Sequence, residues 1–520
     1  MHDTMCVQVH FVINFLENRE MAHESTPRPC CQSSTLSLSF LCIFISIVFV
    51  VFKLSRRTKT NLPPSPPKIP FIGNLHQLGT LPHRSFQALS HKHGPLMLLQ
   101  LGQVPTIIVS SADVAGEIFK THDLVFMNRP KTTTAGIFLY GYKDVAFTPY
   151  GDEWRQKRKV CVLELVSMKS VRSLQFIRLE EVAEMVGAIR EACASETACV
   201  NLSELLIALT NNIMSRCVLG QKYDTPDGIN NFGEIGRKLL TQFTAFYGFF
   251  DQVIAEHKEK MTKKDGIKSE KKDFLGILLQ LQETGSLGFE LSQDILKAML
   301  VDMFIGASDT TATTLEWTMA ELMRDPNSME KAQEEVRRVV GDKAEVDEDD
   351  VKQMSYQRRV VGNCVIKESL RLHPPGPLLL PRETTSGVKL SGYDIPAKTR
   401  VMLNAWAIQR DPKVWDRADE FLPERFEKRD VDLKGQDLYI PFGGGRRGCP
   451  GITFGMSVAE YALANLLYWF DWKLPKTDGT VQGIDMNERY GITVNKKLPL
   501  LLQPIPFSLG SGSKPSHIHH

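Results

Sequence analysis

The chain has 520 residues, of which 42% are hydrophobic and 23% charged, and its formal net charge is +2. This composition is that of a globular protein with a large core, and a net charge so near zero excludes a strongly basic nucleic-acid-binding protein. None of the ten cysteines forms a C-x-x-C pair, and together they lack the dense pattern of a small secreted disulfide scaffold, which fits a reducing compartment.

Residues 36–52, LSLSFLCIFISIVFVVF, form an apolar run without a charged residue. A membrane-spanning helix needs about 17–25 apolar residues, so this run is at the short end. A cleaved signal peptide is the alternative, but the usual basic region before the run is missing and no A-x-A site follows it. Four basic residues follow it closely: Lys53, Arg56, Arg57 and Lys59. Because positive charge stays on the cytoplasmic side, we expect a single-pass anchor with residues 1–35 in the lumen.

A basic and proline-rich linker, residues 53–70, follows the anchor. Proline fixes φ and lacks an N–H, so this run predicts a stiff, extended spacer; a polyproline ligand for another domain is the alternative. Residues 71–507 contain no second linker and no repeat, which predicts one large domain. Residues 508–520 are predicted to be a disordered tail. Met21 is an alternative start of the chain.

The large domain is predicted to be mainly α-helical with small β-sheets. Strand-like runs occur at residues 97–101, 106–110 and 389–393, and turn residues within 387–397 indicate a hairpin. Residues 292–323 are long and mostly apolar, which predicts a buried helix.

Inside that helix, residues 306–311 read GASDTT. The small residues at 306–308 leave room for a flat group against the helix, while Asp309 and Thr310 stand where apolar residues would pack better. The alternative is that the Thr310 hydroxyl bonds back to a carbonyl one turn earlier.

Two further pairs have helical spacing. Glu368 and Arg371 are three residues apart and can pair on one face, although as an isolated surface ion pair they would contribute little. Trp154 and Arg158 are four residues apart and share a helix face.

Residues 441–451, PFGGGRRGCPG, carry the strongest chemical signal. Glycines allow a backbone to approach a flat ligand closely. Arg446 and Arg447 place positive charge beside Cys449, and Pro450 suits the first turn of a helix, whose positive end also favours a thiolate. The alternative is a glycine-rich connector that carries an inert cysteine.

This segment resembles the haem-binding loop F-x-x-G-x-R-x-C-x-G of the cytochrome P450 family. The pattern is matched at Phe442, Gly445, Arg447, Cys449 and Gly451. The resemblance implies a single cytochrome P450-type haem domain behind the anchor. It also implies that Cys449 is the thiolate ligand of the iron of haem b, that Arg447 contacts a haem propionate, and that the loop around it, with Gly443, lines the haem.

Other segments resemble further motifs of the family. Residues 306–311 resemble A/G-G-x-D/E-T, with a departure at Ala307, which implies that Asp309 and Thr310 deliver protons during the activation of O2. Glu368 and Arg371 resemble the E-x-x-R motif, and Arg425 resembles its partner, which implies a buried structural network. Three side chains are implied to contact haem propionates: Trp154, Arg158 and Arg382.

The linker and the cysteine loop together resemble the plant A-type microsomal branch, which serves specialised metabolism. The resemblance implies a monooxygenase on the endoplasmic reticulum membrane with electrons from NADPH through a separate reductase, and with cytochrome b5 as a second candidate partner. Substrate-facing residues are implied at 128–145, 302–310, 375–380 and 489–492. Because these are mostly apolar, we expect a lipophilic substrate of terpenoid, phenolic or alkaloid type. The alternatives are an isomerase or dehydratase without O2, or an inactive haem-binding protein.

One region departs from the family pattern. Between residues 238 and 251 the chain is shorter than expected where family members build a roof over the substrate. The nine residues 242–250 would make only two or three helical turns, about 14 Å in length. A lost internal piece is the interpretation that we favour; a genuine short variant with an open pocket is the alternative.

Overall fold

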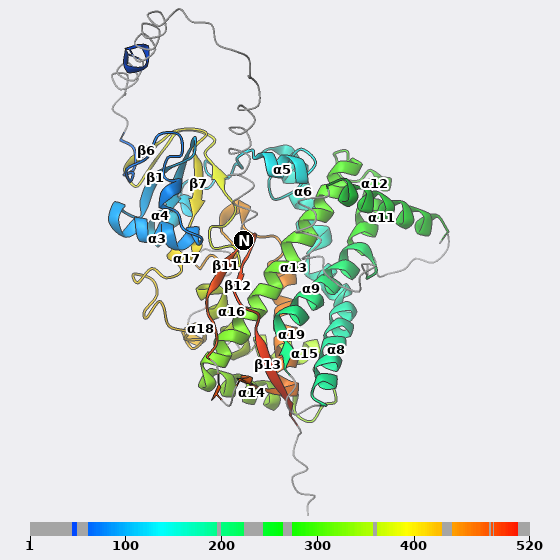
Figure 1. Ribbon diagram of the computed structural model, residues 1–520. Helices are drawn as coiled ribbons and strands as arrows, with labels where there is room; N and C mark the ends of the chain where they lie inside the picture. The colour runs from blue at the N-terminus through cyan, green and yellow to red at the C-terminus, as the bar shows by residue number, and fades with distance from the viewer. Residues whose placement is uncertain are drawn as a thin grey trace, which may run out of the picture. The chain divides into compact units, whose positions relative to one another are not determined.

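Figure 1 shows the computed structural model of the chain. It describes residues 44–48, 61–194, 199–222, 243–263, 273–356, 361–428, 439–477, 480–481 and 483–507. Contacts between Cα atoms divide the chain into two units: residues 1–63 with 388–395, and residues 64–387 with 396–520.

The first unit contains a β-hairpin of β5 (Val388–Leu390) and β6 (Tyr393–Ile395). Ser391 and Gly392 both have positive φ, 48° and 83°, which is the backbone of a tight hairpin turn. The hairpin predicted at 387–397 is therefore confirmed, but the single strand expected at 389–393 is wrong, because that run crosses the turn. The carbonyl of Asn61 accepts the N–H of Asp394 in this hairpin at 2.7 Å, and the N–H of Asn61 donates to the Asp394 carboxylate at 3.2 Å.

The second unit is mainly helical, as expected. Its helices are α3 (Pro82–His93), α4 (Ala112–Lys120), α5 (Thr133–Phe138), α6 (Asp152–Val160), α7 (Met168–Ser173), α8 (Gln175–Ala192), α9 (Leu202–Leu219), α11 (Phe243–Lys263), α12 (Phe274–Thr284), α13 (Gln293–Arg324), α14 (Pro326–Val340), α15 (Glu348–Tyr356), α16 (Val361–Leu372), α17 (Ala405–Ile408), α18 (Arg425–Lys428) and α19 (Ile452–Trp469). Three short helical turns lie at η1 (Leu75–Gln77), η2 (Cys161–Leu165) and η3 (Gly445–Arg447).

The sheets of this unit are small. A four-stranded sheet has the order β1 (Leu96–Leu101), β2 (Val104–Val109), β7 (Arg400–Leu403) and β4 (Arg382–Glu383), with β2 and β7 parallel. A three-stranded sheet has the order β3 (Val200–Asn201), β13 (Leu501–Pro506) and β8 (Phe470–Lys473). Two pairs complete the set: β9 (Lys476–Thr477) with β10 (Thr480–Val481), and β11 (Glu488–Tyr490) with β12 (Val494–Lys496). The strands predicted at 97–101 and 106–110 are confirmed as β1 and β2.

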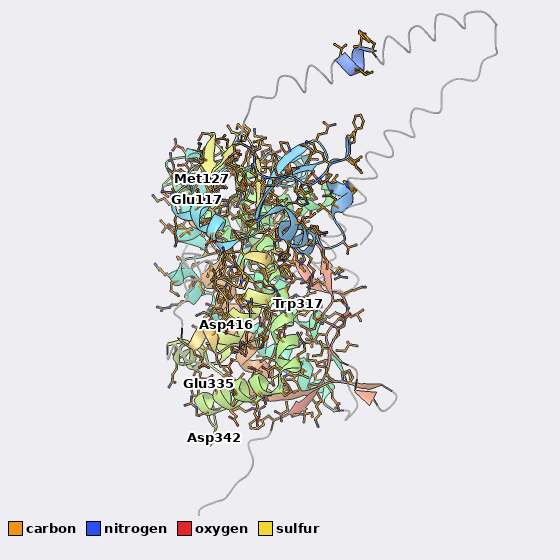
Figure 2. The ribbon with its side chains drawn as sticks, turned by 90° about the vertical axis from the view of Figure 1, so that its left-hand side faces the viewer. Glu117, Met127, Trp317, Glu335, Asp342 and Asp416 are labelled. Atoms are coloured by element: carbon orange, nitrogen blue, oxygen red, sulfur yellow. The ribbon has the colours of Figure 1, made fainter. Side chains whose placement is uncertain are left out.

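Helix α13 runs through the middle of this unit beside α9, and it also packs on α16 and α19 (Figure 1). It begins where the Ser292 hydroxyl accepts the N–H of Ile295 and ends before Pro326, so it confirms the helix predicted at 292–323. Trp317, which Figure 2 labels, is a fully buried side chain of this helix. Ile305 and Gly306 interrupt the burial, because both are exposed in a helix that is otherwise mostly covered.

Residues 128–145, where substrate contacts were expected, contain helix α5. The Thr132 hydroxyl caps this helix by accepting the N–H of Ala135 at 3.3 Å. The segment is therefore partly helical, and the capping hydrogen bond of Thr132 fixes the backbone at the start of α5.

Several predictions from the sequence concern residues that lie outside the described ones. They are most of the anchor at 36–52, of which 44–48 are described, residues 53–60 of the linker, part of the short region before residue 251, and the tail. Within the parts of the chain that the structure describes, no helix combines the length and the apolar character that crossing a membrane requires.

Candidate functional site

Cys449 lies in a tightly folded loop that leads into α19. Its N–H donates to the carbonyl of Phe442 at 2.9 Å. Gly443 and Gly445 have φ of 71° and 64°, and a Cβ on Gly445 would lie 2.1 Å from Asp123 Oδ1. Glycine is therefore required at 445 both by the backbone conformation and by the space.

The thiol of Cys449 has one exposed face and is otherwise surrounded by protein. Its Sγ accepts the N–H of Gly451, the residue that precedes α19, at 3.3 Å. Burial raises the pKa of the Cys449 thiol, and the N–H of Gly451 and the charge of Arg158 act in the opposite direction. The loop thus directs a polarised sulfur to its open side.

The positive charge near the sulfur has a different origin from the one expected. Arg446 pairs with Asp123 at 3.0 Å, and Arg447 donates to the carbonyls of Met127 and Thr148, both at 2.7 Å. Arg158 is the arginine that acts on the thiol. The expectation that the two neighbouring arginines favour the thiolate is therefore wrong, because chain neighbours in this loop point to other partners.

The four side chains expected at haem propionates do come together around this loop. Arg158 donates to the carbonyl of Gly448 at 2.6 Å, and Arg382 donates to the carbonyl of Gly444 at 2.7 Å. The guanidinium of Arg447 lies 4.1 Å from the ring centroid of Trp154. Elements that lie far apart in sequence, α6, β4 and η3, therefore meet at the cysteine.

These arginines repel one another. Burial, followed by the charges of Arg382 and Arg158, lowers the pKa of Arg447 to about 9. Burial lowers the pKa of Arg382 to about 10, with Asp123 acting in the opposite direction. Arg129, also buried, has its pKa lowered by burial and then by Arg382 and Arg447.

A cluster of buried cations with few carboxylate partners is costly unless anions join it. The two propionates of haem are such anions, and the sulfur of Cys449 is the ligand that its iron would take. One hydrogen-bonding group supports the same interpretation, because Arg382 Nη1 makes no hydrogen bond within the described residues, although it lies 3.5 Å from Asp123 Oδ1, and could donate to a propionate. The residues of this site therefore fit haem in both charge and donor chemistry.

The acid and hydroxyl of α13 are held differently from each other. The Thr310 hydroxyl donates to the carbonyl of Gly306 at 2.8 Å, which is the back-bonded arrangement that the sequence left as the alternative. Asp309 is partly buried and accepts a hydrogen bond from the Thr493 hydroxyl. Burial raises the pKa of Asp309, while Thr493, Asn495 and the charge of Arg489 act in the opposite direction.

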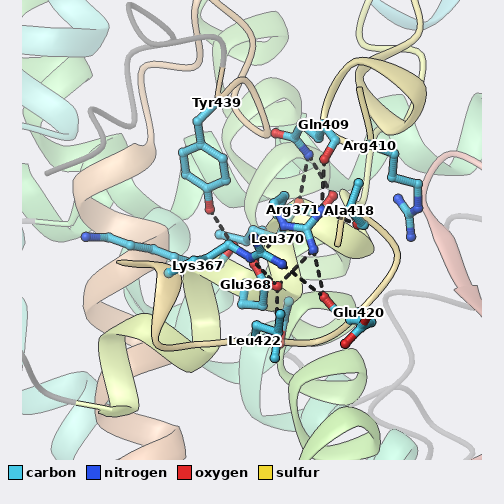
Figure 3. Close-up of polar contacts among 12 residues, drawn as sticks. Lys367, Glu368, Leu370, Arg371, Gln409, Arg410, Ala418, Glu420, Leu422 and Tyr439 are labelled. Atoms are coloured by element: carbon cyan, nitrogen blue, oxygen red, sulfur yellow. Dashed lines mark hydrogen bonds and ion pairs between the residues drawn. The ribbon is translucent and has the colours of Figure 1, made fainter. Parts of the chain in front are cut away.

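Glu368 and Arg371 form the buried network that the resemblance implied (Figure 3). Both side chains are fully buried, and Arg371 donates to both carboxylate oxygens at 2.7 and 2.8 Å. Arg425 donates to the same carboxylate at 2.9 Å, as does the N–H of Leu422. The remaining hydrogens of Arg371 reach the carbonyls of Gln409, Ala418 and Glu420.

Two residues that the sequence did not point out connect this network with the cysteine loop. Gln409 donates to the carbonyls of Leu370 and Arg371, both at 3.0 Å, and its Oε1 accepts the N–H of Ile440 at 2.9 Å. The Tyr439 hydroxyl donates to the carbonyl of Lys367 at 2.7 Å. Residues 439 and 440 begin the segment that leads to Cys449, so the network sets where that segment starts.

The segments expected to face the substrate are linked by hydrogen bonds. Asp302 on α13 accepts the N–H groups of Val145 and Ala146 at 2.6 and 3.1 Å. Arg129 donates to the carbonyl of Ala146 at 2.9 Å and to that of Leu380 at 2.8 Å. Three of the four segments are thereby tied together.

Residues 493 and 494, which directly follow the fourth segment, close the ring. The N–H of Val494 donates to the carbonyl of Pro375 at 3.0 Å, and Thr493 contacts Asp309 on α13. The first three segments and the residues next to the fourth therefore form a closed circuit of contacts that begins and ends on α13. Each contributes a large apolar side chain that is at least partly solvent-exposed: Ile137, Ile305, Leu380 and Ile492.

Sequence reasoning missed the buried charges of this circuit. Asp302 and Asp144 are close enough for the charge of Asp144 to raise the pKa of Asp302, after burial, which is the larger cause. No motif marks these carboxyls or Arg129, and their partners lie far away in the chain. Only the three-dimensional arrangement shows their role in holding residues 145 and 146.

Comparisons with known proteins agree with this geometry. A family model described as Cytochrome P450 matches residues 63–231 and 226–502. Phenylacetaldehyde oxime monooxygenase of Prunus mume is 50% identical, covering 92% of this chain and 97% of that protein. Strychnine-11-hydroxylase of Strychnos nux-vomica is 44% identical, covering 91% and 98%. The structure of a zebra fish cytochrome P450 with progesterone gives a TM-score of 0.70 at 27% identity, covering 82% of this chain and 100% of that one.

The same comparisons bear on the short region. The two matched segments meet at residues 226–231, next to it. The alignment with the Prunus mume protein runs over 518 residues, although 92% of this 520-residue chain amounts to about 478, so about 40 aligned positions have no residue in this chain. The chain is therefore shorter inside the alignment than this relative.

We predict that Arg371→Ala destabilises the protein by about 3–5 kcal/mol, because it leaves the buried Glu368 carboxylate without its main partner. Denaturant-induced unfolding, followed by circular dichroism, measures the change. Arg417→Ala is the control: this arginine pairs with Glu420 at 3.4 Å with both side chains more than half exposed, and its loss costs about 0–1 kcal/mol. Equal effects of the two substitutions would contradict the prediction.

Proposed function

The chain belongs to the cytochrome P450 family, and we propose that it inserts one oxygen atom of O2 into a lipophilic small molecule with electrons that a separate reductase takes from NADPH. The observation that carries the proposal is the meeting of Cys449 with the arginine cluster, and Val145 links this cluster to α13, because Arg447 donates to its carbonyl and Asp302 accepts its N–H. Haem b, when bound, supplies the activation of oxygen. The protein supplies the sulfur, the charges, the protons and a pocket that excludes water.

We assign the holding of haem to residues of two elements, α6 and β4, and of the cysteine loop. Cys449 provides the axial sulfur, and the propionates are bound by the guanidinium and indole groups described above. The full set is Trp154, Arg158, Arg382, Phe442, Gly443, Arg447, Cys449 and Gly451. Hydrogen bonds to backbone carbonyls, those of Gly448, Gly444 and Met127, keep the three arginines in place, so they are ordered before an anion arrives.

Asp309 and Thr310 carry the proton transfer in this proposal. The raised pKa of Asp309 moves the carboxyl toward neutrality, where an acid can both hold and release a proton. Thr310 has to turn its hydroxyl away from the Gly306 carbonyl to donate toward the open side of α13. Gly306 permits an approach there, because its Cα carries no side chain and nothing lies within 4 Å of an added Cβ.

We place the substrate inside the circuit of segments that starts and ends on α13. Its exposed apolar side chains suit a lipophilic molecule of terpenoid, phenolic or alkaloid type. The names of two relatives support this class, because one acts on an aromatic oxime and the other hydroxylates strychnine.

We also propose a single-pass anchor in the endoplasmic reticulum membrane, formed by residues 36–52, with the haem domain in the cytosol. The apolar run and the basic residues after it support this topology. The reductase, with cytochrome b5 as a second candidate, would then reach the domain from the same side of the membrane.

We expect the purified full-length chain, mixed with a plant cytochrome P450 reductase, to consume NADPH and O2 and to convert at least one compound of a lipophilic panel that includes phenylacetaldehyde oxime and strychnine. Mass spectrometry after turnover under ¹⁸O2 measures the incorporated oxygen. Omission of the reductase is the control. Conversion that continues without O2 and NADPH would instead indicate an isomerase or dehydratase.

Cys449→Ala is expected to abolish haem retention, because it removes the proposed axial ligand. The reduced protein with carbon monoxide should lose the red-shifted Soret band that thiolate ligation produces. Cys193→Ala, a partly buried thiol far from the loop in sequence, should keep it. A normal band in the Cys449 variant would refute the ligand assignment.

Thr310→Ala is expected to keep haem but to lower the product formed per NADPH, with peroxide released instead, because proton delivery is impaired. Thr318→Ala is the matched control, since its hydroxyl also bonds back to a helix carbonyl, that of Thr314, at 2.7 Å. The two ratios are measured side by side; if they are equal, Thr310 has no part in the reaction.

Removal of residues 1–57 is expected to convert an integral membrane protein into one that high salt or carbonate releases at least in part. Fractionation of expressing cells, followed by immunoblotting of both forms, gives the measurement. Full-length protein that stays in the soluble fraction without detergent would argue against the anchor.

A further inference from the structure

A polar stripe on α13 faces the hairpin of β11 and β12. Asp309, Thr313 and Glu316 are spaced at i, i+4 and i+7, which places them on one face of the helix. The Thr313 hydroxyl donates to Asn495 Oδ1 at 2.6 Å, and the N–H of Lys496 donates to Glu316 at 3.4 Å. The hairpin is therefore docked along the stripe by directed polar contacts.

The contacts of Thr493 are the most informative part of this docking. The Thr493 side chain is 3% exposed, and its hydroxyl is within hydrogen-bond distance of two acceptors. One is the Asp309 carboxylate, and the other is Asn495 Oδ1 at 2.8 Å. The Thr313 hydroxyl, also buried, lies 3.5 Å from Thr493 Oγ1.

A hydroxyl has one hydrogen, so Thr493 cannot donate to both groups at once. When Asp309 is protonated, it donates to Thr493, and Thr493 donates to Asn495 Oδ1. When Asp309 is ionised, Thr493 donates to Asp309, and the Asn495 side chain also favours the carboxylate while its Oδ1 still accepts from Thr313. Asp309 thus keeps its hydrogen bond to Thr493 in both protonation states.

This property suits an acid that gains and loses a proton in every turnover. A buried carboxyl whose surroundings satisfy only one state would be trapped in that state, because an unsatisfied buried polar group costs about 1–3 kcal/mol. Here, rotation of the Thr493 hydroxyl accommodates the change, because it has an acceptor in each orientation. Arg489, on β11, is a charged group that also acts on Asp309, and it favours the ionised form.

We propose that Thr493 and Asn495 are positioning residues that hold Asp309 for proton transfer and let it change protonation state without losing hydrogen bonds. The inference rests on the proposed function, because it requires Asp309 to be the acid of the reaction. Thr493 directly follows the turn at 489–492 where substrate contacts were expected. The hairpin therefore contacts the proton-transfer acid as well as bordering the substrate.

The test compares Thr493→Val, which keeps the shape and removes the hydroxyl, with Thr493→Ser, which restores it. The first readout is product formed per NADPH with phenylacetaldehyde oxime as the probe. The second is the pH titration of the Asp309 carboxyl by infrared spectroscopy, in which the band is assigned by its loss in Asp309→Asn. Thr399→Val is the control, since its buried hydroxyl donates to the carbonyl of Pro396 at 2.8 Å.

In Thr493→Val we expect a several-fold lower product ratio and an Asp309 titration that moves to higher pH, because a hydrogen bond that favours the carboxylate is lost. Serine should restore both readouts, the control should change neither, and the carbon monoxide band should stay normal in all variants. Unchanged coupling together with an unmoved titration would overturn the proposal, as would a shift that serine does not reverse.

Two other outcomes, an inactive wild-type enzyme and an unfolded variant, can be distinguished from a failure of this proposal. If the wild-type enzyme does not convert the oxime, the proposed activity on this probe fails, and the infrared titration alone decides about Thr493. If Thr493→Val does not fold, Asn495→Ala takes its place, because it removes the other half of the arrangement and leaves the hydroxyl. Its Asp309 titration should move in the same direction, and an unmoved one overturns the proposal.

Discussion

The carboxylate of Glu368 is fully buried, so every hydrogen bond that it needs has to come from the protein. Arg371, Arg425 and the N–H of Leu422 provide them, and Arg371 in turn needs carbonyls from three further positions. A missing partner would leave a buried charge, so the helix α16 and residues 409–425 have to be in place together. Through Gln409 and Ile440 this requirement extends to the cysteine loop. The geometry of the reactive sulfur thus depends on an ion pair that takes no part in the chemistry.

The arginine cluster at the cysteine shows the opposite arrangement of charge. Around Glu368, each charge has enough partners, and the network is complete without any ligand. Around Cys449, Arg129, Arg158, Arg382 and Arg447 share few carboxylates, and burial lowers the pKa of each of them; for Arg129 and Arg447 the neighbouring arginines lower the pKa further. A complete network indicates a structural role, whereas an incomplete one indicates a place for an anion. This difference distinguishes the structural arginines around Glu368 from the ligand-binding arginines around Cys449, although the two sets look alike in sequence.

Local patterns in the sequence predicted what depends on near neighbours. Strands β1 and β2, the long α13 and the pairing of Glu368 with Arg371 all follow from periodicity or short spacing, and the family motifs located the site. Long-range contacts were not predictable in this way. Asp302 and Arg129 show no local signal, because their partners lie elsewhere in the chain, and Arg446 was misjudged because adjacency in sequence does not fix where a side chain points. The same holds for Asn495, whose role appears only when the hairpin lies on α13.

The close contact at Gly444 and Gly445 has a consequence for engineering. A Cβ at 444 would lie 3.2 Å from the ring of Phe119, and the backbone of 445 is packed against Asp123. The loop and the end of α4 are therefore complementary surfaces, although more than 300 residues separate them in the chain. A chimera that exchanges the cysteine loop between relatives has to carry residues 119–123 with it, since a bulkier neighbour there would displace the loop. Recombination that takes the cysteine loop and residues 119–123 from the same parent should give folded, haem-binding products more often than recombination that takes them from different parents.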